Sequence, residues 1–233
     1  HTDNLDKFFT PRPKVDWPAY SAMSSHDALM VANGITTVLD AIAVGDVRDG
    51  GHRFDNLNKM VEAIRQGQEK GLNRAEHRLH LRCELPHDAT VPLFEQLMNT
   101  PDLLLVSLMD HSPGQRQYTS LQKYREYFQG KYHLSNPQMD AFEEEQRGLA
   151  ARWSQPNRLA IAALCRKKGI ALASHDDATV EHVNESLQVG SAIAEFPTTE
   201  AAARCSHDRG LLVLMGAPNV VRGGSHSGNV SAS

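Results

Sequence analysis

The sequence lacks the features that mark several broad classes of protein. It contains no apolar run of about 18 residues, so we expect no membrane-spanning helix, and no charged-then-apolar leader opens the chain. Its 24 Lys and Arg residues are outnumbered by 28 Asp and Glu residues, which gives a formal net charge of -4. Nucleic-acid-binding domains usually carry a basic field. We therefore expect neither nucleic acid nor a membrane as a partner, although local cations could still bind a small anion.

Cysteine is scarce, whereas histidine is plentiful. Cys83, Cys165 and Cys205 show no CxxC spacing and leave one thiol unpaired in any disulfide scheme, which favours a reducing, cytoplasmic location. The 12 histidines exceed the 5 tyrosines and the 2 tryptophans. Imidazole groups bind metals and transfer protons near neutral pH. The composition therefore predicts a metal site or a proton-transfer site.

Short apolar runs alternate with helical stretches, which predicts the strand–helix pattern of a parallel sheet. The 233 residues are 40% hydrophobic, enough for one domain with a sizeable core. The predicted strands are residues 35–39, 79–85, 103–109, 170–174, 192–196 and 211–215. The predicted helices are residues 25–33, 55–70, 91–99, 157–168, 179–189 and 199–208.

Six strands with five crossovers fit either a doubly wound sheet or a (β/α)8 barrel with pieces missing. Histidines and carboxylates such as Glu84, Asp110 and His175 follow several different strands, and barrel active sites are assembled in this way. We therefore predict an α/β fold of the TIM-like (β/α)8 barrel type. The barrel would be incomplete over residues 1–233, with a truncated first strand and without its eighth strand.

Residues 112–154 are too long for a simple connection between a strand and a helix, and they predict a helical insertion. The segment contains several tyrosines, among them Tyr118 and Tyr124, and the acidic run Glu143–Glu145. Two interpretations stay open. The segment could cover the barrel mouth as a lid, or it could be a packed decoration with a solvated acidic face.

Candidate ligands lie near strand ends. His1 and Asp3 are two residues apart, so on an extended strand end their side chains point the same way. His80, Arg82 and Glu84 share one face of their predicted strand. A polar face inside a barrel must be paired or bind something, because an unpartnered buried charge is costly.

His175 follows a strand of small residues. Ala171 and Ala173 alternate with it on one face, which leaves room for an imidazole where a metal could sit. The alternative is a histidine that caps a helix or bonds within the core. Asp176 and Asp177 are interpreted as orienting groups or as caps of the following helix.

The glycine-rich stretch 222–229 is interpreted as an anion cradle. Glycines let the backbone approach a phosphate, while Arg222, Ser225 and Ser227 can donate hydrogen bonds to it. Arg116 lies in a second stretch of this character and is another candidate for binding phosphate. A merely flexible loop is the alternative interpretation of the glycine-rich stretch.

Six segments, read together, resemble one family of enzymes. They are His1–Leu5, His80–Glu84, Ser107–Gln117, Ser174–Thr179, Ala194–Thr199 and Arg222–Asn229. Along its whole length the chain resembles the metal-dependent hydrolases of the amidohydrolase superfamily, and within them the diphosphatases of phosphonate breakdown. The resemblance implies a barrel that holds one or two divalent ions (zinc, manganese or iron). It also implies a small flanking β-sandwich, which would lie mostly outside this chain.

The same resemblance implies roles for individual residues. The implied metal ligands lie at strand ends: His1, Asp3, Glu84, His175 and Glu195. Asp3 replaces the second histidine of the superfamily's usual HxH pair, and Glu195 replaces its usual histidine on the sixth strand. Asp110 and His226 are the implied catalytic residues. The superfamily's general-base Asp of strand eight has no counterpart, so we expect the chain to be a piece of a longer enzyme.

The implied reaction is hydrolysis of the 5-triphosphate of α-D-ribose 1-methylphosphonate 5-triphosphate with release of diphosphate. A metal would activate the attacking water, while Arg116 and Arg222 would neutralise charge on the polyphosphate. The expected partner is a small phosphorylated ribose, and a homo-oligomer is left open. Two alternatives remain: hydrolysis of a C–N bond, as by a deaminase or an N-acyl hydrolase, and a non-catalytic barrel that binds anions.

Overall fold

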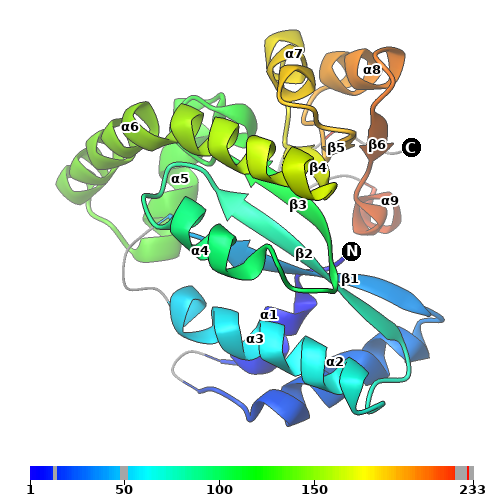
Figure 1. Cartoon of the computed structure of the whole chain (residues 1–233). Coiled ribbons are helices and arrows are strands. Elements are labelled where there is room, and N and C mark those ends of the chain that lie inside the picture. Colours follow the sequence, from blue (N-terminus) through cyan, green and yellow to red (C-terminus); the bar gives the residue numbers. More distant parts are fainter. Residues whose placement is uncertain (13–14, 48–51, 224–229, 231–233) are drawn as a thin grey trace.

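The computed structural model describes residues 1–12, 15–47, 52–223 and 230, which form an α/β fold built on one parallel sheet (Figure 1). Its six strands pair in chain order, and every adjacent pair is parallel. They are β1 (Thr37–Val44), β2 (Glu76–Glu84), β3 (Leu103–Met109), β4 (Ala171–His175), β5 (Ile193–Glu195) and β6 (Leu212–Leu214). The strand order does not reverse, whereas a reversal is the mark of a doubly wound sheet.

Helices connect the strands. They are α1 (Asn4–Phe9), α2 (Ala19–Ala32), α3 (His52–Glu69), α4 (Thr90–Leu97), the short 3-10 helix η1 (Arg116–Tyr118), α5 (Leu121–Tyr132), α6 (Asn136–Lys168), α7 (Val180–Gln188), α8 (Glu200–Asp208) and α9 (Ala217–Arg222). In Figure 1, α2 and α3 lie below β1 and β2, while α7 and α8 lie at the top, beyond β4 to β6.

The two faces of the sheet differ in chemistry because successive side chains of a strand point to opposite sides. On β2, Leu79, Leu81 and Cys83 are buried in the main hydrophobic core. That core also contains residues of α3, α4 and α6, so these helices cover the same face. His80 and Arg82 lie on the other face. The alternation thus places a hydrocarbon core on one side of the sheet and a polar set of side chains on the other.

The N-terminal residues extend the sheet beyond β1. The backbone N–H of Thr2 donates to the carbonyl of Leu39 (3.1 Å), and the N–H of Ala41 donates to the carbonyl of Thr2 (2.8 Å). Thr2 therefore forms a parallel bridge with Asp40. This pairing holds His1 next to the polar face of the sheet, as expected for the end of a preceding strand.

Each of the six predicted helices overlaps an observed one, but the structure also contains α1, η1, α5 and α9, and one helix is much longer than predicted. Each predicted strand overlaps an observed one, and β3 spans the predicted residues 103–109. The helix predicted at 157–168 begins at Asn136, behind a capping box formed by Ser135 and Gln138, and it continues through Pro156. Proline removes one helical hydrogen bond, which is why the sequence pattern indicated a break there.

Tertiary contacts explain why α6 continues past its proline. The amide of Asn157 donates to the carbonyls of Leu85 and His87, both at 2.8 Å, and its side chain is buried. These bonds hold the second half of α6 against the end of β2. Local sequence preferences carry no information about such partners, which lie about 70 residues earlier in the chain.

Residues 112–154 contain η1, α5 and the first part of α6, and their buried side chains form a small separate core. Tyr118, Tyr124 and Phe128 are buried there with Met139, Phe142 and Val47. The rings of Tyr124 and Phe128 lie 4.6 Å apart between centroids. The aromatic residues therefore serve packing, and the role of this segment as an insertion or a lid stays a prediction.

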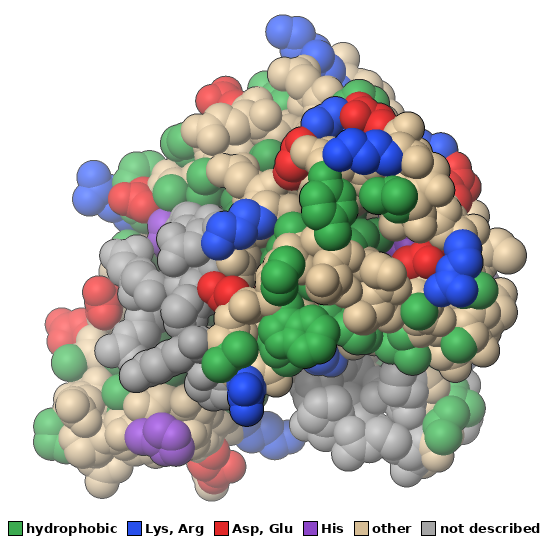
Figure 2. Space-filling model, turned by 90° about the horizontal axis from the view of Figure 1, so that it is seen from below, with side chains coloured by type: hydrophobic (Ala, Val, Ile, Leu, Met, Phe, Trp, Pro, Cys, Tyr) green, Lys and Arg blue, Asp and Glu red, His purple; other side chains and the backbone are tan. Residues whose placement is uncertain are grey.

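One surface of the molecule carries grouped hydrophobic side chains. Seen from below, green side chains gather in the middle with charged ones around them (Figure 2). Trp17, just before α2, and Tyr20 and Leu29, within α2, are hydrophobic side chains that are 40 to 49% exposed. Within the described part of the chain, no helix combines the length and the apolar character needed to cross a membrane.

Candidate functional site

Glu195, at the end of β5, is the centre of a buried polar group. Its Oε1 lies 3.1 Å from Nδ1 of His1. Its Oε2 lies 3.1 Å from Nδ1 of His175 and accepts a hydrogen bond from Ser107 Oγ (2.6 Å). The Glu195 side chain has no exposed surface. Residues from the N-terminus, β3, β4 and β5 thus meet around one carboxylate, because parallel strands present their carboxyl ends at the same edge of the sheet.

His80 completes this group from the middle of β2. Its Nε2 lies 2.5 Å from Ser107 Oγ and 3.7 Å from Glu195 Oε1. Ligand atoms of His1, His80 and Glu195 lie within 4.8 Å of one another. Two buried atoms of the group, Glu195 Oε1 and His80 Nδ1, have no hydrogen-bond partner among the described residues. A buried carboxylate oxygen without a hydrogen bond, flanked by imidazole nitrogens, is an arrangement suited to a cation.

The protonation states of His80 and Glu195 favour cation binding. Burial lowers the pKa of His80 to about 4, although the negative charge of Glu195 opposes the shift. Burial alone would raise the pKa of Glu195, but the hydrogen bonds from His175 and Ser107 help to lower it overall. Near neutral pH, His80 is therefore an uncharged imidazole and Glu195 a carboxylate. Both are the forms that bind metals.

A second cluster lies beside the first. The Oε2 atom of Glu84 lies 2.6 Å from Nδ1 of His111, and Glu84 Oε1 accepts the backbone N–H of His111 (3.1 Å). Burial alone would lower the pKa of His111, but the charge and hydrogen bond of Glu84 outweigh it and raise this pKa. The rings of His111 and His175 lie 6.0 Å apart between centroids. Ligand atoms of His111, His175 and Asp176 also lie within 4.8 Å of one another.

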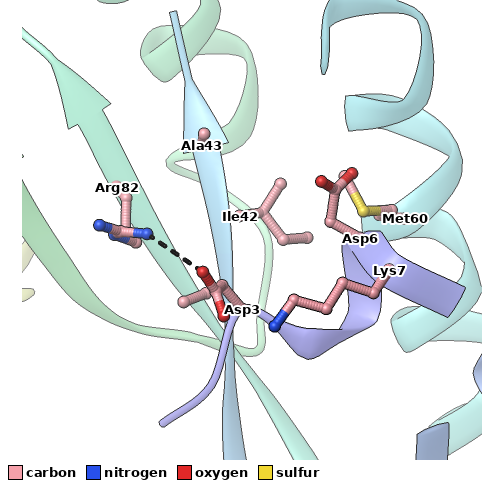
Figure 3. A pocket seen from close by; sticks show the side chains of 8 residues that line it. Asp3, Asp6, Lys7, Ile42, Ala43, Met60 and Arg82 are labelled. Carbon is pink, nitrogen blue, oxygen red and sulfur yellow. Dashed lines mark ion pairs between the residues drawn. The ribbon is translucent and has the colours of Figure 1, made fainter. Parts of the chain in front are cut away.

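A pocket lies beside Arg82, near the end of β2. The Nη2 atom of Arg82 lies 3.1 Å from Nε2 of His175, and Nη1 lies 3.9 Å from Oδ2 of Asp3. Figure 3 shows Arg82 and Lys7 reaching toward Asp3 from opposite sides. The pocket is lined by Asp3, Asp6, Lys7, Ala41, Ile42, Ala43, Met60 and Arg82. It therefore has two carboxylates and two cations in its wall.

The structure brings together three of the five residues predicted as metal ligands. His1 and His175 both contact the carboxylate of Glu195. Glu84 contacts His111, whose ring lies 6.0 Å from that of His175 between centroids. The Asp3 side chain is 61% exposed and faces Arg82 in the pocket, outside the group of His1, His80 and Glu195.

Asp110 and Arg116 both contact charged or polar side chains within the fold. The carboxylate of Asp110 accepts hydrogen bonds from Ser112 and lies 3.9 Å from Nη2 of Arg158. Arg116 is 1% exposed, and its guanidinium pairs with Asp177 and with Glu185 (2.8 Å). Burial and the nearby charge of Arg158 lower the pKa of Arg116 to about 10, so it is a cation at neutral pH.

An internal ion pair occupies Arg116, whereas a phosphate-binding side chain was expected. A phosphate would have to replace two carboxylates to reach it, so the observed contacts do not favour Arg116 as a phosphate-binding residue. The predicted residues Ser225, His226 and Ser227 lie outside the described part of the chain, and so does the side chain of Arg222.

Three residues of these clusters were not predicted as ligands. His80 was recognised only as part of a polar strand face, although its alternation with Arg82 and Glu84 was a usable signal. Ser107 stands inside the apolar run of β3, where a hydroxyl gives no pattern of its own. His111 follows Asp110 in the sequence. The contact with Glu84 that raises the pKa of His111 is visible only in the fold.

Comparison with known proteins gives one strong sequence match. No protein-family model matches the chain. The chain is 72% identical, over all 233 of its residues, to α-D-ribose 1-methylphosphonate 5-triphosphate diphosphatase of Escherichia coli (strain K12). It spans 62% of the length of that relative. Among solved structures, an uncharacterized protein matches 97% of this chain and 52% of its own, with a TM-score of 0.48 and 15% identity.

Proposed function

We propose that this chain is the metal-binding portion of a hydrolase that removes diphosphate from α-D-ribose 1-methylphosphonate 5-triphosphate. The observation that carries the proposal is the 72% identity, across every residue of the chain, to the E. coli diphosphatase. The buried group around Glu195 supports it, because this group offers the chemistry that a metal-dependent hydrolase requires. That relative's activity does not favour C–N bond hydrolysis or a non-catalytic anion-binding barrel.

The proposal includes the fold of the whole enzyme. Six parallel strands in chain order, one face covered by helices and a polar opposite face are the features of a barrel segment. The bridge between Thr2 and Asp40 supplies the position of one more strand before β1. We therefore assign the chain to a (β/α)8 barrel in which the polar face lines the interior.

The residues that would hold a divalent ion are His1, His80 and Glu195, with His175 next to them. Two nitrogens and one carboxylate oxygen form a donor set that suits zinc, manganese or iron. Glu195 Oε1, which accepts no hydrogen bond from the described residues, fits this assignment. A bound ion would lower the pKa of a coordinated water and polarise a phosphoryl oxygen.

The surrounding residues orient the group. Ser107 donates its proton to Glu195, so its oxygen accepts from Nε2 of His80 and ties the two side chains together. The Arg82 guanidinium can only donate, so Nε2 of His175 accepts from it and the His175 proton lies on Nδ1, facing Glu195. The contact with Glu84 raises the pKa of His111, which favours a protonated imidazole beside His175.

The test combines metal analysis with product identification. The purified protein is incubated with the ribose triphosphate and manganese or zinc, and the products are followed by phosphorus NMR. We expect diphosphate and a ribose 5-phosphate from the wild type, and loss of both metal and turnover in His80→Ala. If the 233 residues are inactive alone, the assay is repeated with the unmatched part of the E. coli relative supplied. No diphosphate from either preparation contradicts the proposal.

A further inference from the structure

Arg82 lies where a substrate phosphate could reach both a cation and the group around Glu195. It stands on the polar face of β2 between His80 and Glu84, and its guanidinium contacts His175 at 3.1 Å. Across the β1–β2 pair, Ala43 is the register partner of Arg82 and Ala41 is the partner of His80. These small side chains leave the space that the pocket occupies (Figure 3).

The guanidinium of Arg82 retains donors for a ligand. Its side chain is 23% exposed, so it borders both the protein interior and the pocket. A guanidinium carries five N–H donors, and among the described residues Arg82 uses one of them in a hydrogen bond to His175. Its ion-pair partner Asp3 stands 3.9 Å away and is 61% exposed, so this pair is weak and can open.

Two other arginines near the site are occupied instead. Arg116 is buried between Asp177 and Glu185. Arg158 is 4% exposed and lies 3.3 Å from Glu185. Their guanidinium groups are paired with carboxylates of the protein itself. Of these three described arginines, Arg82 is the one whose charge faces the pocket.

A second cation lies across the pocket from Arg82. The ammonium of Lys7 donates to Asn4 Oδ1 (2.9 Å), and it forms no ion pair with the residues that the structure describes. Lys7 is exposed, and Figure 3 shows its side chain extending toward Asp3. A polyanion bridging Arg82 and Lys7 would displace Asp3 from between them.

We infer that Arg82 and Lys7 bind the polyphosphate of the substrate, with Arg82 holding a phosphate next to His175 and Lys7 contacting a more distant one. The inference rests on the proposed function for the identity of the ligand. A planar guanidinium can bind two phosphate oxygens at once, so Arg82 fixes orientation, while the lysine acts as a point charge. Asp3 keeps the guanidinium aimed into the pocket until the phosphate replaces it.

Inorganic triphosphate is the probe that tests this assignment without turnover. Its binding is measured by titration calorimetry at saturating manganese for the wild type, Arg82→Ala, Arg82→Lys and Lys7→Ala. We expect Arg82→Ala to weaken binding by about ten- to a hundredfold, because it removes charge-assisted hydrogen bonds. Arg82→Lys should recover part of the loss, and Lys7→Ala should lose less than Arg82→Ala.

Arg78→Ala is the matched control. Arg78 lies on the same strand and the same face, but at the other end, where it pairs with Glu76 and Asp102. Its replacement should leave triphosphate binding unchanged. Metal content is measured for every variant. If Arg82→Ala loses bound metal in the same proportion as it loses triphosphate binding, Arg82 acts by supporting His175, and the inference is overturned. Wild-type affinity in Arg82→Ala would overturn it as well.

The two proposals fail separately in these experiments. A protein that binds triphosphate through Arg82 but releases no diphosphate from the ribose substrate contradicts the proposed function alone. A protein that releases diphosphate with the same KM in Arg82→Ala as in the wild type contradicts the assignment of Arg82 alone.

Discussion

Asp40 and His77 face each other between β1 and β2, with Oδ2 of Asp40 2.7 Å from Nδ1 of His77, and both are fully buried. His26 reaches the other carboxylate oxygen of Asp40 at 2.6 Å. By strand alternation this cluster lies on the helix-covered face, opposite to His80 and Arg82. The side chain of Asp40 thus anchors β1 on the helix-covered face. The backbone of the same residue bridges to Thr2, which positions His1.

Removing the charge of Asp40 should destabilise the fold. Asp40→Asn leaves two buried imidazoles without their carboxylate, and loss of one partner from a buried pair costs about 3 to 5 kcal/mol. The measurement is the free energy of unfolding from urea titration. Asp102→Asn serves as the control, because Asp102 pairs with the partly exposed Arg78. A change below about 1 kcal/mol in Asp40→Asn, like that expected of surface pairs, would show that the cluster is not a significant source of stability.

Asp27 should make stability depend on acid pH. Burial alone would raise the pKa of Asp27, but hydrogen bonds from the backbone N–H of Ala75 and from Arg74 lower it overall. Because the folded-state pKa is the lower one, the contribution is fully present above the unfolded pKa of about 3.9 and is lost as pH falls through the folded value. Asp27→Asn should therefore destabilise the protein at pH 6.

The same comparison at lower pH checks the sign of this effect. Unfolding free energies of the wild type and of Asp27→Asn are measured between pH 6 and pH 3. We expect the difference between them to shrink steadily below about pH 4. A difference that stays constant, or that grows as pH falls, contradicts the lowered pKa.

Ser107 should tune metal affinity without being a ligand. It accepts from His80 and donates to Glu195, so Ser107→Ala releases both side chains from their fixed orientation. Groups that orient metal ligands typically change affinity by about 10- to 100-fold when removed. Competition with a chelating dye measures this directly. Ser112→Ala is the comparison, since that buried serine bonds Asp110 instead, and equal affinities in the two variants would count against the role of Ser107.

Replacement of Arg116 separates the predicted role from the observed one. Arg116→Met leaves the buried Asp177 without its cation, whereas Glu185 keeps Arg158, so we expect a loss of about 3 to 5 kcal/mol in unfolding free energy. A phosphate-binding role predicts the opposite outcome, near-normal stability with a raised KM. Arg125→Met, which breaks a more exposed pair with Asp140, should cost about 1 kcal/mol or less.

The sequence by itself determined the strands and the residues that could do chemistry. Alternation within residues 79–85 placed Leu79 and Leu81 on one face and His80 on the other, because a strand has a period of two whatever its partners are. Small residues before His175 likewise indicated space for its imidazole. These properties are local, so they can be read along the chain.

Only the tertiary structure decided which of these residues meet and which charges are already used. Glu195 contacts His1, which lies at the start of the sequence. Arg116 pairs with Asp177 and Glu185, which lie 61 and 69 residues farther along the chain. The residues next to an arginine in the sequence look the same whether its charge faces solvent or a buried carboxylate. The difference between Arg116 and Arg82 is set by desolvation and by distant partners, which depend on how the strands and helices pack rather than on the residues beside each arginine.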